Sequence, residues 1–110
     1  MRFLLYSHDS FGLGHLRRSV TIGGRLLEQY PGSSVLITTG SPVATGLHLP
    51  KGIDVLKLPS VTKDRDGSYT PREWDLTLDH LLALRSGLLV SAVECFRPHV
   101  FLVDHKPIGL

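Results

Sequence analysis

Residues 7–18, SHDSFGLGHLRR, connect a short apolar run, Phe3–Tyr6, to a segment with helical spacing. We therefore expect a glycine-containing turn between a strand and a helix. Such a turn presents backbone N–H groups to an anion, because the first turn of a helix leaves them without internal partners. Gly12 and Gly14 can take backbone angles closed to other residues and let a ligand approach closely. His15 is the unusual feature, since a phosphate cradle alone needs no imidazole at the start of its helix.

The composition is that of an ordinary globular chain. Of its 110 residues, 42% are hydrophobic and 20% are charged, and the formal net charge is +2. This charge is too small to indicate nucleic acid as a partner. The single cysteine, Cys95, excludes an internal disulfide and lies in an apolar helical stretch, where we expect it to be buried. No secretory signal and no run of the ~18 apolar residues that span a membrane is present, so we expect a cytoplasmic protein.

Four short apolar runs alternate with helical patterns along the chain. The predicted strands cover residues 2–7, 34–39, 53–58 and 99–104. From His15 to Tyr30 the apolar positions recur in steps of four and three, which predicts an amphipathic helix.

Two further helices are predicted. Ser41, followed by a proline, is typical of an N-cap and indicates a short helix over residues 43–46. Asp75 or Thr77 can cap a longer helix that runs to about Phe96. The apolar surface of this longer helix is broad, which predicts burial against the sheet and against something else as well.

Residues 59–74 interrupt the alternation. Their main part, VTKDRDGSYTPREW at 61–74, carries six charged residues, a glycine and a proline, and fits neither period. The stretch is long for a connection in a compact α/β domain, and long loops are commonly functional or disordered. Both interpretations stay open, a substrate-facing loop and a mobile one.

These patterns predict an α/β fold, a three-layer Rossmann-like arrangement with a parallel sheet covered on both faces. Right-handed crossovers favour the strand order 3-2-1-4, in which strand one neighbours strand four. In open sheets of this kind, ligands bind beyond the carboxyl ends of the strands, where the winding direction reverses. Segments 7–15 and 104–107 would line that crevice, and they are also the segments richest in His, Asp and Gly.

The turn does not fit the common cofactor fingerprints. A dinucleotide-binding turn needs G-x-G-x-x-G, and here Arg17 stands in place of the third glycine. No G-x-x-x-x-G-K-[ST] occurs, which excludes a P-loop. Four side chains at the crevice are of types that ligate metals: His8, His15, Asp104 and His105. Their spacing fixes no metal geometry, so we expect no metal and no bound cofactor.

Residues 12–18, GLGHLRR, resemble the first loop of the GT-B glycosyltransferases, which transfer a sugar from a nucleotide-sugar to an acceptor. Within these enzymes, the stretch is most similar to the bacterial predicted glycosyltransferases related to the N-acetylglucosaminyl transferase of peptidoglycan synthesis. The stretches DGSYTPRE, LRSGLL and FRPHVFLVDHKPIG are similar to the same subgroup, so the likeness covers essentially the whole chain. The resemblance implies a hexosyltransferase in which His15 is the base on the acceptor hydroxyl and Asp104 orients it.

The resemblance also implies the ligands. The residues expected to bind substrate are Gly12, Gly14, Arg18 and His105. Arg18 shares a helix face with His15 and is suited to an acidic acceptor group or a phosphate. A nucleotide-sugar is the expected donor and co-substrate, with an acceptor that the sequence does not identify.

The family's fold has two Rossmann-like domains with the active site between them. Residues 1–110 correspond to the acceptor-side, N-terminal domain, and the donor-binding C-terminal domain has no counterpart here. We therefore expect an incomplete unit that is inactive alone and needs the missing domain as its partner. Peripheral contact with a membrane is a further expectation for the full-length protein.

Two other functions fit the same sequence. One is a nucleotide-sugar epimerase on the same scaffold. The other is a non-catalytic module that binds a phosphorylated small molecule through the Gly12–Arg18 turn. His15 and Asp104 also have structural interpretations, because a histidine can cap a helix and a carboxylate at the end of a buried strand usually needs a partner.

Overall fold

The computed structural model describes residues 1–7 and 14–104. The elements in chain order are β1 (Arg2–Ser7), α1 (Gly14–Gln29), β2 (Ser34–Thr39), the 3₁₀ helix η1 (Ala44–Gly46), β3 (Ile53–Lys57), β4 (Val61–Lys63), β5 (Tyr69–Pro71), α2 (Leu78–Phe96) and β6 (Val100–Val103). The predicted α/β class is confirmed, and the four main strands lie within a residue of their predicted bounds.

Four strands form one parallel sheet in the order β3-β2-β1-β6. Because β6 is the fourth strand predicted from the sequence, the expected order 3-2-1-4 is confirmed. In the middle of β1, Leu5 lies opposite Ile37 of β2 on one side and Leu102 of β6 on the other. The carboxyl ends of β1 and β6 are therefore neighbours, as a ligand crevice between them requires.

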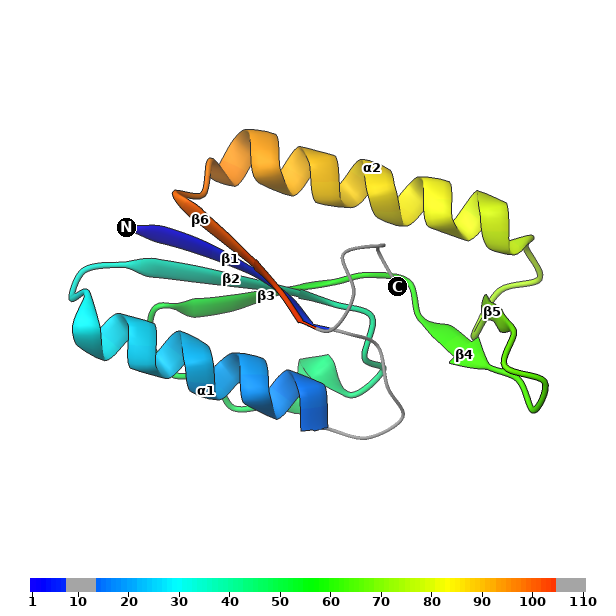
Figure 1. Cartoon of the computed structure of the whole chain (residues 1–110), viewed down its shortest axis with the longest axis horizontal. Coiled ribbons are helices and arrows are strands. Elements are labelled where there is room, and N and C mark those ends of the chain that lie inside the picture. The colour runs from blue at the N-terminus through cyan, green and yellow to red at the C-terminus, as the bar shows by residue number, and fades with distance from the viewer. Residues whose placement is uncertain (8–13, 105–110) are drawn as a thin grey trace.

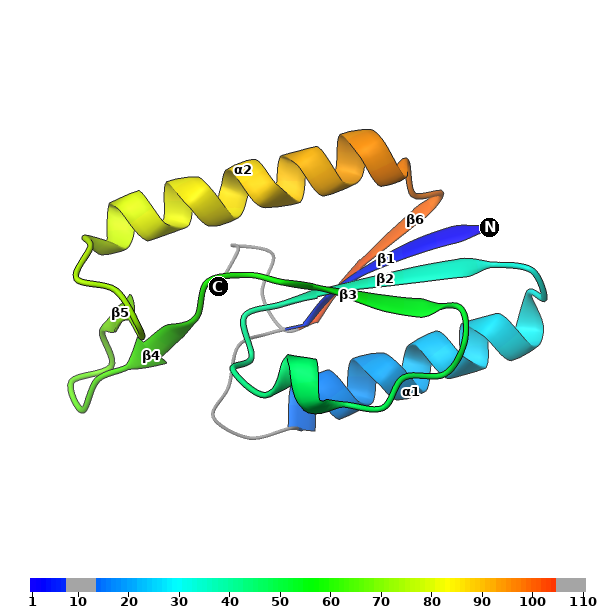
Figure 2. The ribbon, with the colours of Figure 1, turned by 180° about the vertical axis from the view of Figure 1, so that it is seen from behind.

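The two long helices lie on opposite faces of this sheet (Figure 1), and the reverse view shows the same layering (Figure 2). Successive residues of a strand point to opposite faces, so Phe3 and Leu5 face one helix while Leu4 and Tyr6 face the other. Phe3 and Leu5 belong to the main core, together with Leu16 of α1. All four of these β1 side chains are buried, which fits the continuous apolar run that predicted a central strand.

A glycine lets α1 approach the sheet closely. Gly23 lies on the buried face of α1, as the apolar spacing of that helix predicts. A Cβ atom at this position would lie 3.1 Å from Ile53 Cδ1 and 3.1 Å from Val35 Cγ1. These distances are shorter than ordinary van der Waals contact, so the missing side chain sets how near α1 sits to β2 and β3.

The ends of α2 follow their local signals. Thr77 caps the helix, since its Oγ1 accepts a hydrogen bond from His80 N at 3.1 Å. At the other end Arg97 adopts the left-handed conformation with φ of 55°, and its N–H donates to the Val93 carbonyl. Pro98 follows, so the helix cannot continue.

Much of the apolar surface of α2 is left uncovered by the described part of this chain, and its burial against a further element stays a prediction. Only Leu81 and Arg85 are buried, and Cys95, which we expected to be buried, is exposed. The helix packs against β5, but its C-terminal half leaves an apolar groove of about 310 Å³ beside β6. This groove is lined by Leu89, Val90, Val93, Glu94 and Phe101. Because apolar residues occur all round α2, the sequence pattern does not show which side faces the sheet.

Residues 59–74 contain an element that the sequence did not predict. β4 and β5 pair antiparallel as a small hairpin, with Val61 opposite Pro71. Its turn is closed by backbone hydrogen bonds from Asp64 N to the Ser68 carbonyl and from Gly67 N to the Asp64 carbonyl. Gly67 has the positive φ of 88° that glycine tolerates. Each strand is only three residues long, which is too short for an alternating pattern to show.

The short helix after β2 begins later than expected, with Val43 and not Ser41 at its N-cap. The Ser41 hydroxyl instead lies 3.5 Å from Val43 N, at the turn that precedes this helix. Within the described residues, no helix is long and apolar enough to cross a bilayer.

Candidate functional site

The parallel pairing of β1 and β6 places the carboxyl ends of these two strands side by side, although the strands are distant in the sequence. Asp104 directly follows β6, and its backbone N–H donates to the Tyr6 carbonyl at 2.9 Å, so the ladder fixes its position. His15 is the second residue of α1, the next described element after β1. The site therefore lies at the carboxyl edge of the sheet, where ligands of open α/β sheets bind.

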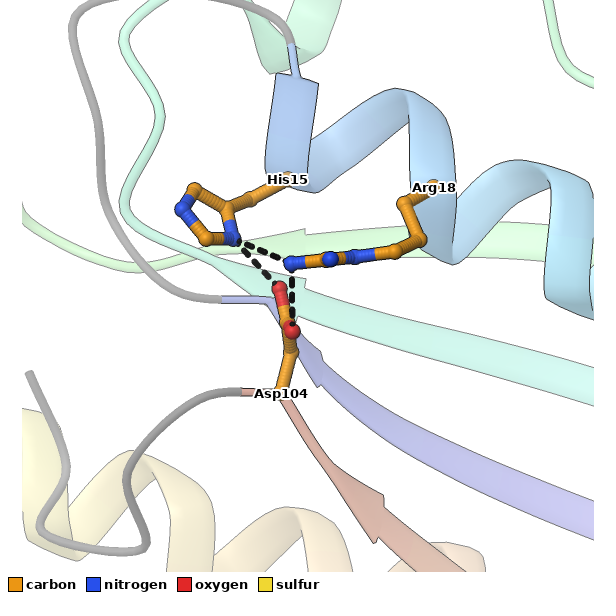
Figure 3. Close-up of polar contacts among 3 residues, drawn as sticks. All are labelled: His15, Arg18 and Asp104. Atoms are coloured by element: carbon orange, nitrogen blue, oxygen red, sulfur yellow. Dashed lines mark hydrogen bonds and ion pairs between the residues drawn. The ribbon is translucent and has the colours of Figure 1, made fainter.

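Three side chains meet at this edge, as Figure 3 shows. His15 Nδ1 lies 2.6 Å from Asp104 Oδ2, and Arg18 Nη2 lies 2.7 Å from Asp104 Oδ1. Each partner thus takes a different oxygen of the carboxylate. The side chains of His15 and Asp104 are 28% and 20% exposed, which leaves the pair accessible to a substrate while one turn of α1 and the end of β6 hold it in place.

The hydrogen-bonding capacity of these groups decides the protonation of the imidazole. An ionised carboxylate only accepts hydrogen bonds, so the bond to Asp104 requires a proton on Nδ1 of His15. Arg18 Nη2 is also near this nitrogen, at 2.8 Å, but a nitrogen that donates to Asp104 cannot accept from a guanidinium at the same time. We therefore assign the neutral ring a proton on Nδ1 and its lone pair to Nε2.

The ionisation of Asp104 supports this assignment. Burial raises the pKa of the Asp104 carboxyl, but hydrogen bonds from His15 and Arg18, together with the charge of Arg18 and of protonated His15, outweigh this effect. The net result is a pKa below the ordinary value of 3.8. At neutral pH the carboxylate is thus the acceptor that the Nδ1 proton needs.

Open space adjoins the pair. A groove of about 290 Å³ runs between α1 and the β1–β6 edge. It is lined by Leu5, Tyr6, Arg18, Ser19, Ile22, Leu102, Val103 and Asp104. One end of the groove is therefore polar and charged, while its walls are largely apolar, the combination found in small-molecule sites.

The structure brings together three of the six residues that the sequence singled out. His15, Arg18 and Asp104 meet, and the predicted approach of His15 to Asp104 is confirmed. Gly12 and His105 lie outside the described residues. Gly14 is the first residue of α1, and its role in binding substrate stays a prediction. Among residues 1–7 and 14–104, no atom would lie within 4 Å of a Cβ added at Gly14.

The pairing of Arg18 with Asp104 was missed from the sequence. The three-residue step from His15 to Arg18 already placed both side chains on one face of α1, and Asp104 was expected beside His15. Together these two observations imply the contact. A role of Arg18 toward an acidic substrate group stays a prediction, since its guanidinium already binds the carboxylate.

No family model, curated protein or solved structure matches the chain. Among residues 1–7 and 14–104, no group of three His, Cys, Asp or Glu side chains is arranged to hold a metal ion.

Proposed function

We propose that this chain is the acceptor side of a glycosyltransferase and that His15 is its base. The observation that carries the proposal is the 2.6 Å contact between His15 Nδ1 and Asp104 Oδ2 at the carboxyl edge of the sheet. The contact fixes the tautomer in which Nε2 bears the lone pair. The resemblance of residues 12–18 to the first loop of the GT-B enzymes supports the same chemistry.

The proposed reaction transfers a sugar from a nucleotide-sugar. The oxygen of the acceptor hydroxyl forms a bond to the anomeric carbon, and the bond from that carbon to the nucleoside diphosphate breaks. The diphosphate leaves with the electron pair, and the hydroxyl proton passes to Nε2 of His15. An imidazole suits this task because its unperturbed pKa is near neutral pH.

Asp104 and Arg18 act on the base and not on the sugar. As Nε2 takes the proton the ring becomes an imidazolium, and the carboxylate beside Nδ1 stabilises that charge. Arg18 holds the second carboxylate oxygen at 2.7 Å, which fixes the orientation of Asp104 and favours its ionised form. We therefore assign Asp104 and Arg18 as positioning residues.

The donor would be held by a second Rossmann-like domain, as the resemblance implies. Transfer between two domains requires the acceptor to approach from the open edge of this sheet, and His15 is 28% exposed at that edge. The groove beside Asp104 offers a space for part of the acceptor.

The test is an assay of the full-length gene product with a panel of nucleotide-sugars and hydroxylated acceptors. We expect release of nucleoside diphosphate that depends on the acceptor, with formation of a glycoside. His15→Ala should lower turnover by roughly 10²–10⁴-fold. The matched control is His80→Ala, which removes an exposed histidine at the start of α2, far along the chain from the site.

Other outcomes would contradict the proposal. Conversion of one nucleotide-sugar into its epimer without an acceptor would identify the epimerase alternative. Tight binding of a phosphorylated small molecule with no turnover of any donor would identify the non-catalytic module. Equal activity of His15→Ala and His80→Ala would show that His15 is not the base.

A further inference from the structure

A second cavity lies at the same edge of the sheet, beyond the carboxyl end of β3. It has a volume of about 170 Å³ and is lined by Lys57, Pro59, Ser60, Pro71, Glu73 and Trp74. Its walls come from the end of β3, from the connection to β4, and from the segment that follows β5. The hairpin β4–β5 is the element at this end of β3 in Figure 1, where it extends away from the sheet.

The apolar part of this cavity contains an unusually exposed aromatic ring. Trp74 is the only tryptophan of the chain, and 47% of its surface is exposed. Indole offers a large flat apolar face and an N–H donor, which makes exposed tryptophan common where ligands bind. Pro59 and Pro71 add rigid apolar surface to the same cavity.

The polar part of the cavity is held in place by hydrogen bonds. Lys57 Nζ donates to Ser60 Oγ at 2.8 Å and to the Leu58 carbonyl. The buried Ser60 hydroxyl in turn donates to the Gly40 carbonyl at 2.6 Å, which ties this connection to the end of β2. The ammonium group is thus fixed on one wall, and the exposed carboxylate of Glu73 is on the same lining.

We propose that this cavity binds a neutral sugar ring. Each sugar hydroxyl both donates and accepts hydrogen bonds, so it can donate to the Glu73 carboxylate while the positive charge of Lys57 attracts the hydroxyl oxygens. The C–H face of a pyranose is apolar and flat, and it matches the exposed indole of Trp74. The volume is below the ~300–1,000 Å³ of sites for drug-sized ligands, and it suits a single ring.

The presence of one positive and one negative side chain in the lining favours a neutral ligand over an ion. A phosphate or carboxylate on the ligand would be attracted by Lys57 but repelled by Glu73, and a cation would meet the reverse arrangement. A polyhydroxylated ring satisfies both groups without a net charge. This composition therefore favours a sugar over the phosphorylated ligands expected at the Gly12–Arg18 turn.

The position of the cavity connects it to the proposed reaction. β3 and β1 are two strand spacings apart in the sheet, which is about 10 Å. A ring in the Trp74 cavity is therefore on the same edge as His15 but does not fill the His15 site itself. The assignment of this ring to the acceptor rests on the proposed function, whereas the binding of the ring does not.

The test uses the fluorescence of Trp74, which reports on this cavity alone because the chain has no other tryptophan. The protein is titrated with methyl β-glucopyranoside, methyl β-galactopyranoside and N-acetylglucosamine, with glycerol at the same concentrations as the control for solvent effects. We expect a saturable change in intensity or wavelength with at least one of the three sugars and none with glycerol. Inorganic phosphate should produce no saturable change.

Variants of Glu73 and Lys57 test whether these two side chains contribute to sugar binding, and control variants exclude general effects on folding. Glu73→Gln and Lys57→Met keep the fluorophore and should each weaken sugar binding by about tenfold or more, because each removes a charged group from the lining of the cavity. Glu28→Gln is the matched control, since the Glu28 side chain is 72% exposed on α1, and it should bind the sugar unchanged. His15→Ala should also bind the sugar unchanged.

Several results would overturn the inference: no saturable response to any of the three sugars, a response that survives both Glu73→Gln and Lys57→Met, or an equal response to inorganic phosphate. Failure of the two proposals can be distinguished. Sugar binding without any transfer activity would contradict the proposed function but support the sugar site at Trp74. Transfer activity without sugar binding at Trp74 would contradict only the proposed sugar site. If Lys57→Met does not fold, the exposed Glu73→Gln decides the matter.

Discussion

Arg85 Nη2 donates a hydrogen bond of 2.8 Å to the Tyr6 hydroxyl, although Arg85 lies on α2 and Tyr6 on the central strand β1. Its Nη1 donates to the Pro59 carbonyl at 2.7 Å, in the connection after β3. Arg85 is only 1% exposed, which is rare for a charged side chain. One guanidinium therefore links α2 both to the central strand β1 and to the segment that leads into the hairpin β4–β5.

Replacing Arg85 should destabilise the protein more than a typical surface change. In Arg85→Ala the Tyr6 hydroxyl and the Pro59 carbonyl lose the hydrogen bonds that Arg85 donates, and each hydrogen bond from a charged group contributes about 1.5–3 kcal/mol. Urea unfolding measures the loss. The control is Arg25→Ala, whose side chain is 81% exposed in a surface pair with Glu28 and which should change stability by less than ~0.5 kcal/mol. Equal stabilities of the two variants would show that the buried guanidinium contributes nothing.

The pair of His15 and Asp104 should behave as one catalytic unit. Asp104→Asn should lower kcat less than His15→Ala, because the base remains but its tautomer and its imidazolium are no longer supported. The double variant should then lose little beyond His15→Ala, since the role of Asp104 is exerted through the imidazole. Steady-state kinetics of the full-length gene product provides the measurement. Losses that multiply fully in the double variant would mean that Asp104 acts independently of His15.

The ion pairs of Asp104 predict how stability depends on pH. Because its folded pKa is below 3.8, the carboxyl binds a proton more readily in the unfolded chain than in the folded one. The stabilisation is therefore present above the unfolded pKa and is lost as the pH falls through the lower folded pKa. We expect Asp104→Asn to be less stable than the wild type at neutral pH, with a difference that shrinks below about pH 4.

Urea unfolding of both proteins from neutral pH to about pH 3 checks this expectation. Arg18→Met removes one of the two donors to the carboxylate and should give a smaller difference in the same direction. A gap between wild type and Asp104→Asn that stays constant over the whole range would contradict the assignment.

Two adjacent glycines of α1 provide a matched pair of substitutions. Gly24→Ala should stabilise the protein by about 0.5–1 kcal/mol, because alanine favours the helix and a Cβ there meets nothing within 4 Å. Gly23→Ala brings the same gain in propensity but places a methyl group 3.1 Å from Ile53 and Val35. It should therefore be less stable than Gly24→Ala by about 1 kcal/mol or more. Thermal or urea unfolding decides, and equal effects would show that α1 moves away from the sheet at little cost.

Much of the fold could be predicted because the two central strands, β1 and β2, are largely buried, whereas the edge strand β6 is mostly exposed. Runs such as Phe3–Tyr6 carry a continuous apolar signal, and the rules for parallel crossovers then left a single common strand order. The meeting of His15 and Asp104 followed from that order alone, since the two residues flank neighbouring strands. This part of the site depended on topology and not on any property of the two side chains.

Other features lacked a signal in the sequence. The hairpin strands Val61–Lys63 and Tyr69–Pro71 are too short to show a period, and their charged neighbours suggested a loop. Cys95 was wrongly predicted to be buried. Apolar residues occur all round α2, so its hydrophobic periodicity did not indicate which side faces the sheet. The burial of Arg85 was not predicted either. An arginine in a leucine-rich helix is normally expected to face solvent. Its buried partner, the Tyr6 hydroxyl, lies on a strand that is distant in the sequence.

The 89 positions that separate His15 from Asp104 also govern the order of folding. Closing so long a loop costs chain entropy, and only the pairing of β6 with β1 compensates for this cost. The contacts among α1, β2 and β3 are closer along the chain, so these elements can assemble earlier. In a refolding protein, helix and core should therefore form before the imidazole gains its carboxylate. During synthesis the same delay would keep the proposed base without its positioning partner until β6 has left the ribosome.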